Sequence, residues 1–474
     1  MRQNLLVVLI VAGCAVPDSP SPHEANLDVE VPEAWSNDAP SSHPPARFWE
    51  TFESADLDRF VSAALDDNPD LRVSLARLDQ AANQARIAGA DLVPTLDFGV
   101  GGRRERRNFV GFPDFGGGDD VLSTTTNSFG ASLSTSWELD LWGRVRSRED
   151  AAQADAQAAV EDFMAARLSL IGQVCRAYFS LREAEAQWNL AKETTESFRT
   201  TAKVVRNRYE RGTRSPLDLR LALDNLHQAE ALEVDRHRQE QVARRAMEVL
   251  LGRYPRGTLD LAGSLPDLVE DVPVGLPAQL LSRRPDMRAF ERRLASSHYR
   301  LQEAKASLYP RLSLTASAGT SSEELKDMVD SDYFVWNLVG NLTQPLFQGG
   351  RLRGQVEVEE ARVREQVATF ASALLNAFSE VENALSSGVF LRDRESALIE
   401  SVKQAEAARR LAEERYRRGL DTFLQVSDAQ RRELTARSQL LQVQRSRLEN
   451  RVDLFIALGG GFDDDAIDGQ ETSP

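Results

Sequence analysis

The main evidence for the fold is the segment Arg415-Tyr416-Arg417-Arg418-Gly419-Leu420-Asp421-Thr422-Phe423-Leu424-Gln425-Val426-Ser427-Asp428-Ala429-Gln430, because a relative of it occurs earlier in the chain. The earlier copy reads Arg208-Tyr209-Glu210-Arg211-Gly212 and continues with Leu217 and Asp218. Each copy ends a long run rich in Ala, Arg and Glu, and each holds a Gly that can adopt a positive φ just beyond a helix. A helical pattern then restarts. Two ordinary helix ends would look the same if either copy stood alone, but the recurrence predicts the tips of two long helical hairpins.

Other pairs recur along the chain, which indicates an internal duplication. Arg284 follows Asn68 by 216 positions, and the segments that begin at these two residues share the same order. Further along, Arg351 follows Arg144 by 207 positions. The first half therefore has nine extra residues, which we place in the Gly- and Arg-rich segment 101–120 and expect to form a loop. The same offset relates Leu251-Gly252 to Leu458-Gly459.

The composition excludes several function classes. A net charge of -16 and a pI near 5.0 argue against nucleic acid, which requires concentrated positive charge. With five His and two Cys, the chain has neither a metal-ligand spacing nor a disulfide framework. It also has no nucleophile elbow, phosphate loop or helical His pair, so we predict neither an enzyme nor a cofactor. Cys175, in an apolar helical stretch, is predicted to be a small buried side chain.

The N-terminus has the form of a secretory address. Met1-Arg2 precedes an apolar run that ends in Val11-Ala12-Gly13-Cys14. This ending resembles the bacterial lipoprotein processing box, in which the Cys becomes the acylated first residue. The residue after the Cys is Ala15 rather than Asp, so the inner-membrane retention signal of such lipoproteins is absent. A signal peptide with an incidental Cys is the alternative. The following segment is rich in Pro, Ser and acidic residues and is expected to be a flexible tether.

Short stretches with period-two patterning predict four β-strands, two in each half. Residues 128–140 alternate apolar and polar side chains, as do 311–318 and 336–343, and a further strand starts at about residue 95. Trp137, Trp142 and Trp336 are expected at a lipid interface. A small soluble sheet is the alternative. After residue 13 no stretch is apolar enough for a spanning helix, and four strands are too few to close a barrel of at least about eight. Closure would therefore need several chains.

Two very long helices are predicted over residues 145–211 and 352–418. At 1.5 Å per residue each would be about 100 Å long, and neither contains Pro. Shorter helical patterns over 217–251 and 424–458 follow the two tips and are expected to return alongside. A fibrous coiled coil is the alternative, but no heptad is sustained through either run.

Three groups of residues carry a resemblance to a known family: Glu138-Leu139-Asp140-Leu141-Trp142-Gly143-Arg144, the segment 344–351 (QPLFQGGR), and the two Arg-Tyr-x-x-Gly tips. Over residues 48 to 459 the chain resembles the TolC-like outer-membrane factors, in particular the acylated, OprM/NodT-like branch that serves resistance-nodulation-division efflux pumps. The resemblance implies a mainly α fold with a β-barrel part. A homotrimer would close a 12-stranded barrel in the outer membrane of a Gram-negative bacterium, with an α-helical tunnel in the periplasm.

The resemblance also implies a function and partners. It predicts the outer-membrane channel subunit of a tripartite efflux pump, a passive conduit that exports drugs or other toxic small molecules. Its partners would be a periplasmic adaptor protein, an inner-membrane resistance-nodulation-division pump and outer-membrane lipid, with no nucleic acid. The exit duct of a type I secretion system is an alternative that an acylated Cys14 disfavours. A lipid-anchored periplasmic coiled-coil spacer would have no use for the strands.

The resemblance further assigns roles at the tips. Carried over by position, Leu424 forms an apolar ring and Asp428 an acidic ring of a periplasmic gate, while Gln425 stands where some members have another Asp. Packing within the hairpin and a solvated carboxylate are the alternative roles. Because Pro216 precedes Leu217 in the first copy, we expect the moving gate in the second hairpin. The tips are expected to contact the adaptor through Tyr209, Gly212, Leu217, Asp218, Tyr416, Gly419 and Asp421, and in relatives Tyr416 and Asp421 mark positions that tie adjacent helices.

These interpretations divide the chain into successive segments. Residues 1–13 are a lipoprotein signal peptide, 14–47 an acylated tether, 48–252 the first repeat, 253–276 an irregular linker, 277–459 the second repeat and 460–474 an acidic, disordered tail.

Overall fold

The computed structural model of the chain describes residues 29, 31–32, 34–36, 45, 47–109, 123–213, 215–261, 263–268, 272, 274–275, 277 and 280–460. The predicted signal segment, Cys14 and the acidic tail beyond residue 460 lie outside these residues, as does most of the tether. The expectations for them therefore stay predictions.

The same order of helices and strands occurs twice in the described chain. The first series follows a 3-10 helix, η2 (Phe48–Phe52), and comprises α1 (Ala55–Asp67), α2 (Pro69–Ala90), β1 (Thr95–Asn108), β2 (Ser123–Leu139), α3 (Arg144–Glu210) and α4 (Pro216–Leu250). The second comprises α5 (Leu280–Arg283), α6 (Pro285–Ala306), β3 (Arg311–Thr320), the 3-10 turns η4 (Leu325–Asp327) and η5 (Ser331–Tyr333), β4 (Phe334–Thr343), α7 (Arg351–Arg417) and α8 (Phe423–Ala457). Both α3 and α7 have 67 residues, and both α4 and α8 have 35. The prediction of long and short helices is confirmed to within one residue at each end.

The prediction that 101–120 forms a loop was wrong for its first part. Strand β1 continues to Asn108, and β2 begins at Ser123 rather than near residue 128. Here Gly101 pairs with Gly130, and the antiparallel register continues without a break to Asn108 and Ser123. Gly is a poor strand former alone, but backbone hydrogen bonds to a partner strand override that preference. The extra residues of the first half thus lengthen a hairpin, because β1 and β2 have 14 and 17 residues whereas β3 and β4 have 10 each.

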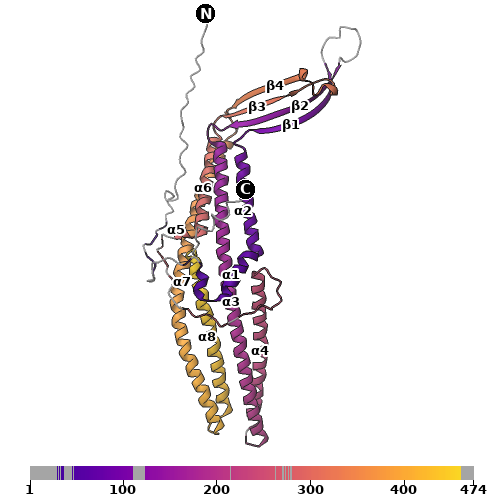
Figure 1. Cartoon of the computed structure of the whole chain (residues 1–474). Coiled ribbons are helices and arrows are strands. Elements are labelled where there is room, and N and C mark those ends of the chain that lie inside the picture. The colour runs from indigo at the N-terminus through magenta and orange to yellow at the C-terminus, as the bar shows by residue number, and fades with distance from the viewer. Residues whose placement is uncertain are drawn as a thin grey trace, which may run out of the picture. The chain divides into compact units, whose positions relative to one another are not determined.

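The four strands form one antiparallel sheet in the order β1-β2-β3-β4 (Figure 1). The pairing of β2 with β3 joins the two repeats, and it places Trp137 opposite Leu314. Strands β1 and β4 each pair on one side only within the described chain. The side chains of β4 are exposed along its whole length, and Trp336 retains 71% of its accessible surface.

No described helix is both long enough and apolar enough to cross a membrane.

The described residues group into two compact units. One contains the sheet together with residues 78–94, 140–159, 290–310 and 344–369, and the other contains the remaining helical segments, both hairpin tips included.

Part of the core of the second unit consists of packed aromatic side chains. Phe48 stacks on Phe455 with ring centroids 4.9 Å apart, and Phe52 packs edge-on against Phe179 at 5.0 Å. Cys175 is fully buried, and burial raises the pKa of its thiol to about 12. A thiol held in its neutral form is a poor nucleophile, so the structure agrees with the prediction of a small packing side chain.

Candidate functional site

Both hairpin tips end their long helix in the same way. In the second tip Gly419 has φ 80°, its N–H donates to the carbonyl of Tyr416 at 3.0 Å, and the N–H of Leu420 donates to that of Arg415 at 3.0 Å. The first tip repeats this pair of bonds around Gly212, with φ 72°. This arrangement is a Schellman motif, which requires a left-handed residue and therefore favours Gly. The sequence prediction of a positive φ at both tips is confirmed.

The two tips differ in how the next helix begins. In the first, Ser215 caps α4 by accepting a hydrogen bond from the N–H of Leu217 at 3.1 Å. In the second, the Thr422 side chain makes no such bond to α8. The carboxylate of Asp421 instead accepts from Arg415 Nε at 2.5 Å, which links the end of α7 to a residue two positions before α8.

The three residues predicted for the gate line one groove between α7 and α8. This groove has a volume of about 1000 Å³, and Leu424, Gln425 and Asp428 contribute to its wall. Leu424 is 58% exposed, so its side chain is available to a further surface. The structure thus brings these residues together, whereas their role as a gate stays a prediction.

Arg432 is a residue of this groove that the sequence analysis missed. Its Nε lies 2.8 Å from Oδ2 of Asp428, one helical turn away. The groove wall therefore carries an ion pair rather than an isolated carboxylate. The spacing of four residues between an acid and a base on a helix was the signal that could have found it.

Tyr416, predicted to contact an adaptor, is buried with 4% of its surface exposed. Its ring packs edge-on against Phe423 at 5.7 Å, inside an apolar cluster that includes Val205 and Leu226 of the first hairpin. Tyr416 therefore supports the tip from inside, and its side chain offers little surface to another protein.

Arg208 of the first hairpin reaches the end of the second long helix. Its guanidinium donates to the carbonyls of Tyr416 at 3.2 Å and Arg417 at 3.1 Å, and lies 5.3 Å from the centre of the Tyr416 ring. The last carbonyls of a helix lack partners within it and carry partial negative charge, so a cation stabilises them. Sequence reasoning did not find this contact, because the Arg lies over 200 positions from its partners.

Two further contacts join the hairpins beside the groove. Asn225 donates to the hydroxyl of Ser427 at 2.6 Å in a buried position. Gln430 donates to Thr201 at 3.4 Å and to Glu413 at 3.1 Å. The segment 425–432 thus has one side on the groove and another held by the first hairpin.

The remaining predicted tip residues lie at the surface to different degrees. Leu217 is 64% exposed and Tyr209 is also exposed, whereas Asp218 is partly buried in the first turn of α4. Gly212 and Gly419 are both exposed. Their contact with an adaptor stays a prediction.

The three Trp residues expected at a lipid interface have different surroundings. Trp137 is partly buried, and its indole N–H donates to the carbonyl of Leu92 at 3.0 Å. Trp142 donates to the carbonyl of Pro310 at 2.7 Å and stacks on Tyr309 at 5.3 Å, with both rings partly exposed. Trp336 is exposed. The last two present aromatic surface, while Trp137 is held by the backbone.

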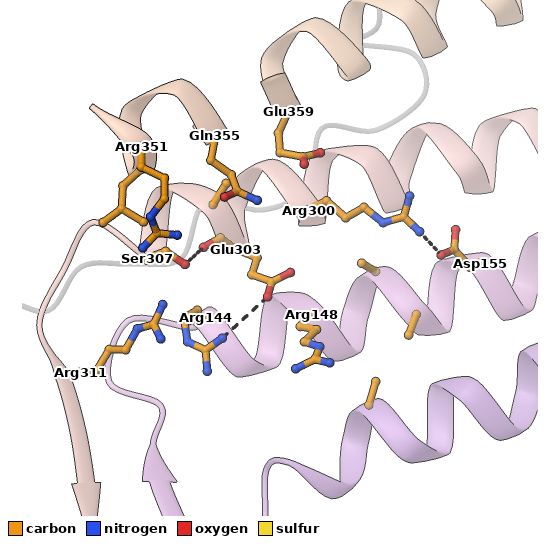
Figure 2. A pocket seen from close by; sticks show the side chains of 15 residues that line it. Arg144, Arg148, Asp155, Arg300, Glu303, Ser307, Arg311, Arg351, Gln355 and Glu359 are labelled. Atoms are coloured by element: carbon orange, nitrogen blue, oxygen red, sulfur yellow. Dashed lines mark hydrogen bonds and ion pairs between the residues drawn. The ribbon is translucent and has the colours of Figure 1, made fainter. Parts of the chain in front are cut away.

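A second cavity, of about 450 Å³, lies where α3 and α7 begin and α6 ends (Figure 2). Guanidinium groups dominate its wall, which includes Arg144, Arg148, Arg300, Arg311 and Arg351. Glu303 lies among them, 3.7 Å from Arg144. Burial raises the pKa of Glu303 and the charge of Glu359 adds to this, while Arg148 and Arg144 oppose it. Within the described part of the chain, no group of three or more His, Cys, Asp or Glu side chains could hold a metal ion.

Comparison with known proteins identifies one family, and the match extends along nearly the whole chain. A family model described as "Outer membrane efflux protein" matches residues 60–253 and 276–460. Outer membrane protein OprJ of Pseudomonas aeruginosa is 34% identical over 470 residues, which cover 97% of this chain and 95% of that protein. The toluene efflux pump outer membrane protein TtgF of Pseudomonas putida is 31% identical over 471 residues, 97% of this chain and 96% of that one.

A solved structure is also similar. CusC, whose crystal structures concern folding and transmembrane channel formation, matches with a TM-score of 0.81 and 27% identity, covering 94% of this chain and all of that one. CusC of Escherichia coli is described as a cation efflux system protein.

Proposed function

The chain belongs to the outer membrane efflux protein family, and we propose that three copies of it form one passive channel whose gate is the groove of the second hairpin. Members of this family are efflux channels rather than enzymes, as the sequence predicted. The protein is an outer-membrane channel component of an efflux pump in a Gram-negative bacterium, and such a pump implies an adaptor and an inner-membrane partner.

The trimer is supported by the open edges of the sheet. Each chain provides four strands, and β1 and β4 each have one unpaired side within the described chain. A lipid-facing sheet edge leaves backbone polar groups without partners, so it must pair with another copy. Twelve strands from three copies satisfy the minimum of about eight for a spanning barrel, whereas four do not.

The gate proposal rests on one observation: Leu424, Gln425 and Asp428 share a groove wall while the opposite side of the same helix is tied to the first hairpin. In a symmetric assembly, Leu424 from each copy would form an apolar constriction, and Asp428 with Arg432 a charged one. Tip residues that stay exposed, Gly212, Leu217 and Gly419 among them, would meet the adaptor.

Planar bilayer conductance tests the gate. We expect Asp428→Ala to raise single-channel conductance about twofold or more, because removing the carboxylate also releases Arg432 from its position in the constriction. Asp393→Ala, an exposed carboxylate of α7 that does not line the groove, is the matched control. Equal conductance of the wild-type protein and Asp428→Ala would contradict the assignment.

Acylation of Cys14 is a separate proposal, supported by the processing box in the sequence. We expect the wild-type protein expressed in a Gram-negative host to incorporate an alkyne-labelled fatty acid and Cys14→Ser to lose the label. Cys175→Ser is the control, because that thiol is buried and should not be acylated. Label that persists in Cys14→Ser would refute the site.

The exported compound is proposed to depend on the pump partner. Relatives named for toluene efflux and for cation efflux match this chain over almost all of its length. A conduit that serves such different compounds in its relatives needs no dedicated binding site for either, so we expect the inner-membrane pump to select the substrate.

A further inference from the structure

The cavity of Figure 2 shows an imbalance between the two repeats. In the first repeat Glu138 binds the guanidinium of Arg144 through two hydrogen bonds, of 2.9 and 2.8 Å. Asp140 accepts from the N–H groups of Val145 at 3.1 Å and Arg146 at 2.8 Å. Two carboxylates of the same repeat therefore accept hydrogen bonds from the first N–H groups of α3 and from its first arginine.

The second repeat lacks both carboxylates. At positions 207 residues later, Pro345 stands for Glu138 and Phe347 for Asp140, while Arg351 keeps the arginine. Helix α7 has no acidic residue in its first turn, and Arg351 donates to the neutral amide oxygen of Gln348. The second repeat therefore gives Arg351 an amide partner where the first repeat gives Arg144 a carboxylate.

A second guanidinium at this cavity is also without a carboxylate partner among the described residues. Arg311, the first residue of β3, lines the cavity and forms no ion pair with any residue that the structure describes. Figure 2 places Arg311 and Arg351 on the same side of the cavity as Arg144, away from the ion pair of Arg300 with Asp155. Two arginines without carboxylate partners favour a phosphate, which accepts from several N–H groups at once.

One acceptor atom in the cavity wall also lacks a hydrogen-bond donor. Glu359 is 7% exposed, and its Oε1 accepts from Arg362 at 2.7 Å. Its Oε2 is buried and has no hydrogen-bond partner among the described residues. A buried carboxylate oxygen without a donor is costly. Since Glu359 lines the same cavity as Arg311 and Arg351, a ligand that satisfied all three side chains would carry a positive donor as well as a negative group.

The surface beside the cavity is apolar and aromatic. Leu346 and Phe347, just before α7, are almost fully exposed, and the stacked pair of Trp142 and Tyr309 is partly exposed. Exposed aromatic residues next to arginines are typical of the boundary between lipid tails and headgroups. An outer-membrane protein contacts phospholipids, and one phospholipid molecule can carry a phosphate, an amine and an apolar part.

We propose that this cavity binds the headgroup of an ethanolamine phospholipid, with its phosphate on Arg311 and Arg351 and its ammonium on Glu359. The inference rests on the outer-membrane location but is independent of the proposed gate. A choline headgroup has no N–H group for Oε2 of Glu359, and a glycerol headgroup has no positive charge. The site is therefore selective for ethanolamine.

Native mass spectrometry of the full-length protein in detergent tests the site. Lipid-depleted protein is mixed with equal amounts of phosphatidylethanolamine, phosphatidylcholine and phosphatidylglycerol that have identical acyl chains, and the bound lipids are counted. We expect the ethanolamine lipid to be retained about tenfold over the other two. The combined substitution Arg311→Gln and Arg351→Gln should remove most of this binding, whereas Arg353→Gln, an exposed arginine of the same helix turn that does not line the cavity, should leave it unchanged.

Glu359→Gln separates the two ends of the site. It should abolish the preference for ethanolamine over glycerol while keeping phosphate-dependent binding, and Glu357→Gln, exposed on the same helix, should have no effect. Equal retention of the three lipids by the wild-type protein, or unchanged binding by the double arginine variant, would overturn the proposal. Neither result bears on conductance, so failure of this site and failure of the gate are distinguishable.

Discussion

The two hairpin tips share a sequence pattern and a helix ending, yet their side chains face different partners. Arg208 and Arg415 occupy equivalent positions, 207 residues apart, and each supplies the carbonyl that closes its own Schellman motif. Arg415 turns to Asp421 within its own tip, whereas Arg208 crosses to the carbonyls at the end of α7. A duplicated motif therefore gives the same backbone but not the same contacts, because the side chain binds whatever the neighbouring hairpin presents.

The largest expected effect comes from the arginine that crosses between the hairpins. Arg208→Ala removes charge-assisted hydrogen bonds that contribute about 1.5 to 3 kcal/mol. If they hold the second hairpin closed, the ratio of open to closed channels should rise roughly ten- to a hundredfold. Open probability in planar bilayers measures this.

Arg415→Ala is the matched control for that experiment. It removes an ion pair inside one tip whose guanidinium is exposed to solvent, and such pairs contribute little to stability, so the channel should open far less often than with Arg208→Ala. If the two variants behave alike, the difference between the tips has no functional meaning.

A smaller effect is expected from the exposed leucines after each tip. Leu424 and Leu217 are equivalent in the duplication and similarly exposed, but Leu424 lines the groove. Leu424→Ser should raise single-channel conductance about twofold, because it widens an apolar constriction and eases its wetting. Leu217→Ser should leave conductance unchanged and weaken adaptor binding in a pull-down assay. The reverse pattern would place the gate in the first hairpin.

The smallest effect concerns the start of the returning helices. Ser215→Ala removes a helix cap and should lower the stability of the first tip by about 1 kcal/mol, seen as faster amide exchange in the first turn of α4. Thr422→Ala should leave exchange in α8 nearly unchanged, since Thr422 makes no capping bond. Equal acceleration at both tips would mean that the observed cap does not distinguish them.

Much of the fold could be predicted because it depends on local chemistry. The long helices follow from an unbroken run without Pro, and the tips from Gly419 and Gly212, which can adopt the left-handed backbone. The error over residues 101–108 has the opposite origin. Their strand exists because residues 123–130 lie opposite, and the pattern of residues 101–108 alone does not reveal that pairing.

The candidate site divides in the same way. The family resemblance names Leu424, Gln425 and Asp428, and spacing along a helix explains why the three share a face. The pairing of Asp428 with Arg432 was also within reach of that argument. The burial of Tyr416 was not, because it depends on apolar residues of the first hairpin that pack around it.

The duplication, the lengths of the helices, the left-handed tips and the family can all be read from the amino-acid order, since each depends on residue order and local backbone preference. The partners that each copy of a motif binds depend on the folded arrangement of the chain. Arg208 and Arg415 begin the same Arg-Tyr-x-x-Gly motif, yet Arg208 binds carbonyls over 200 positions away and Arg415 binds Asp421 in its own tip. Arg144 binds Glu138, six residues before it, whereas Arg351 donates to Gln348. The opening stretch, residues 415–430, is a helix turn by its backbone pattern, a candidate gate by its resemblance to the family, and part of a groove wall in the tertiary structure.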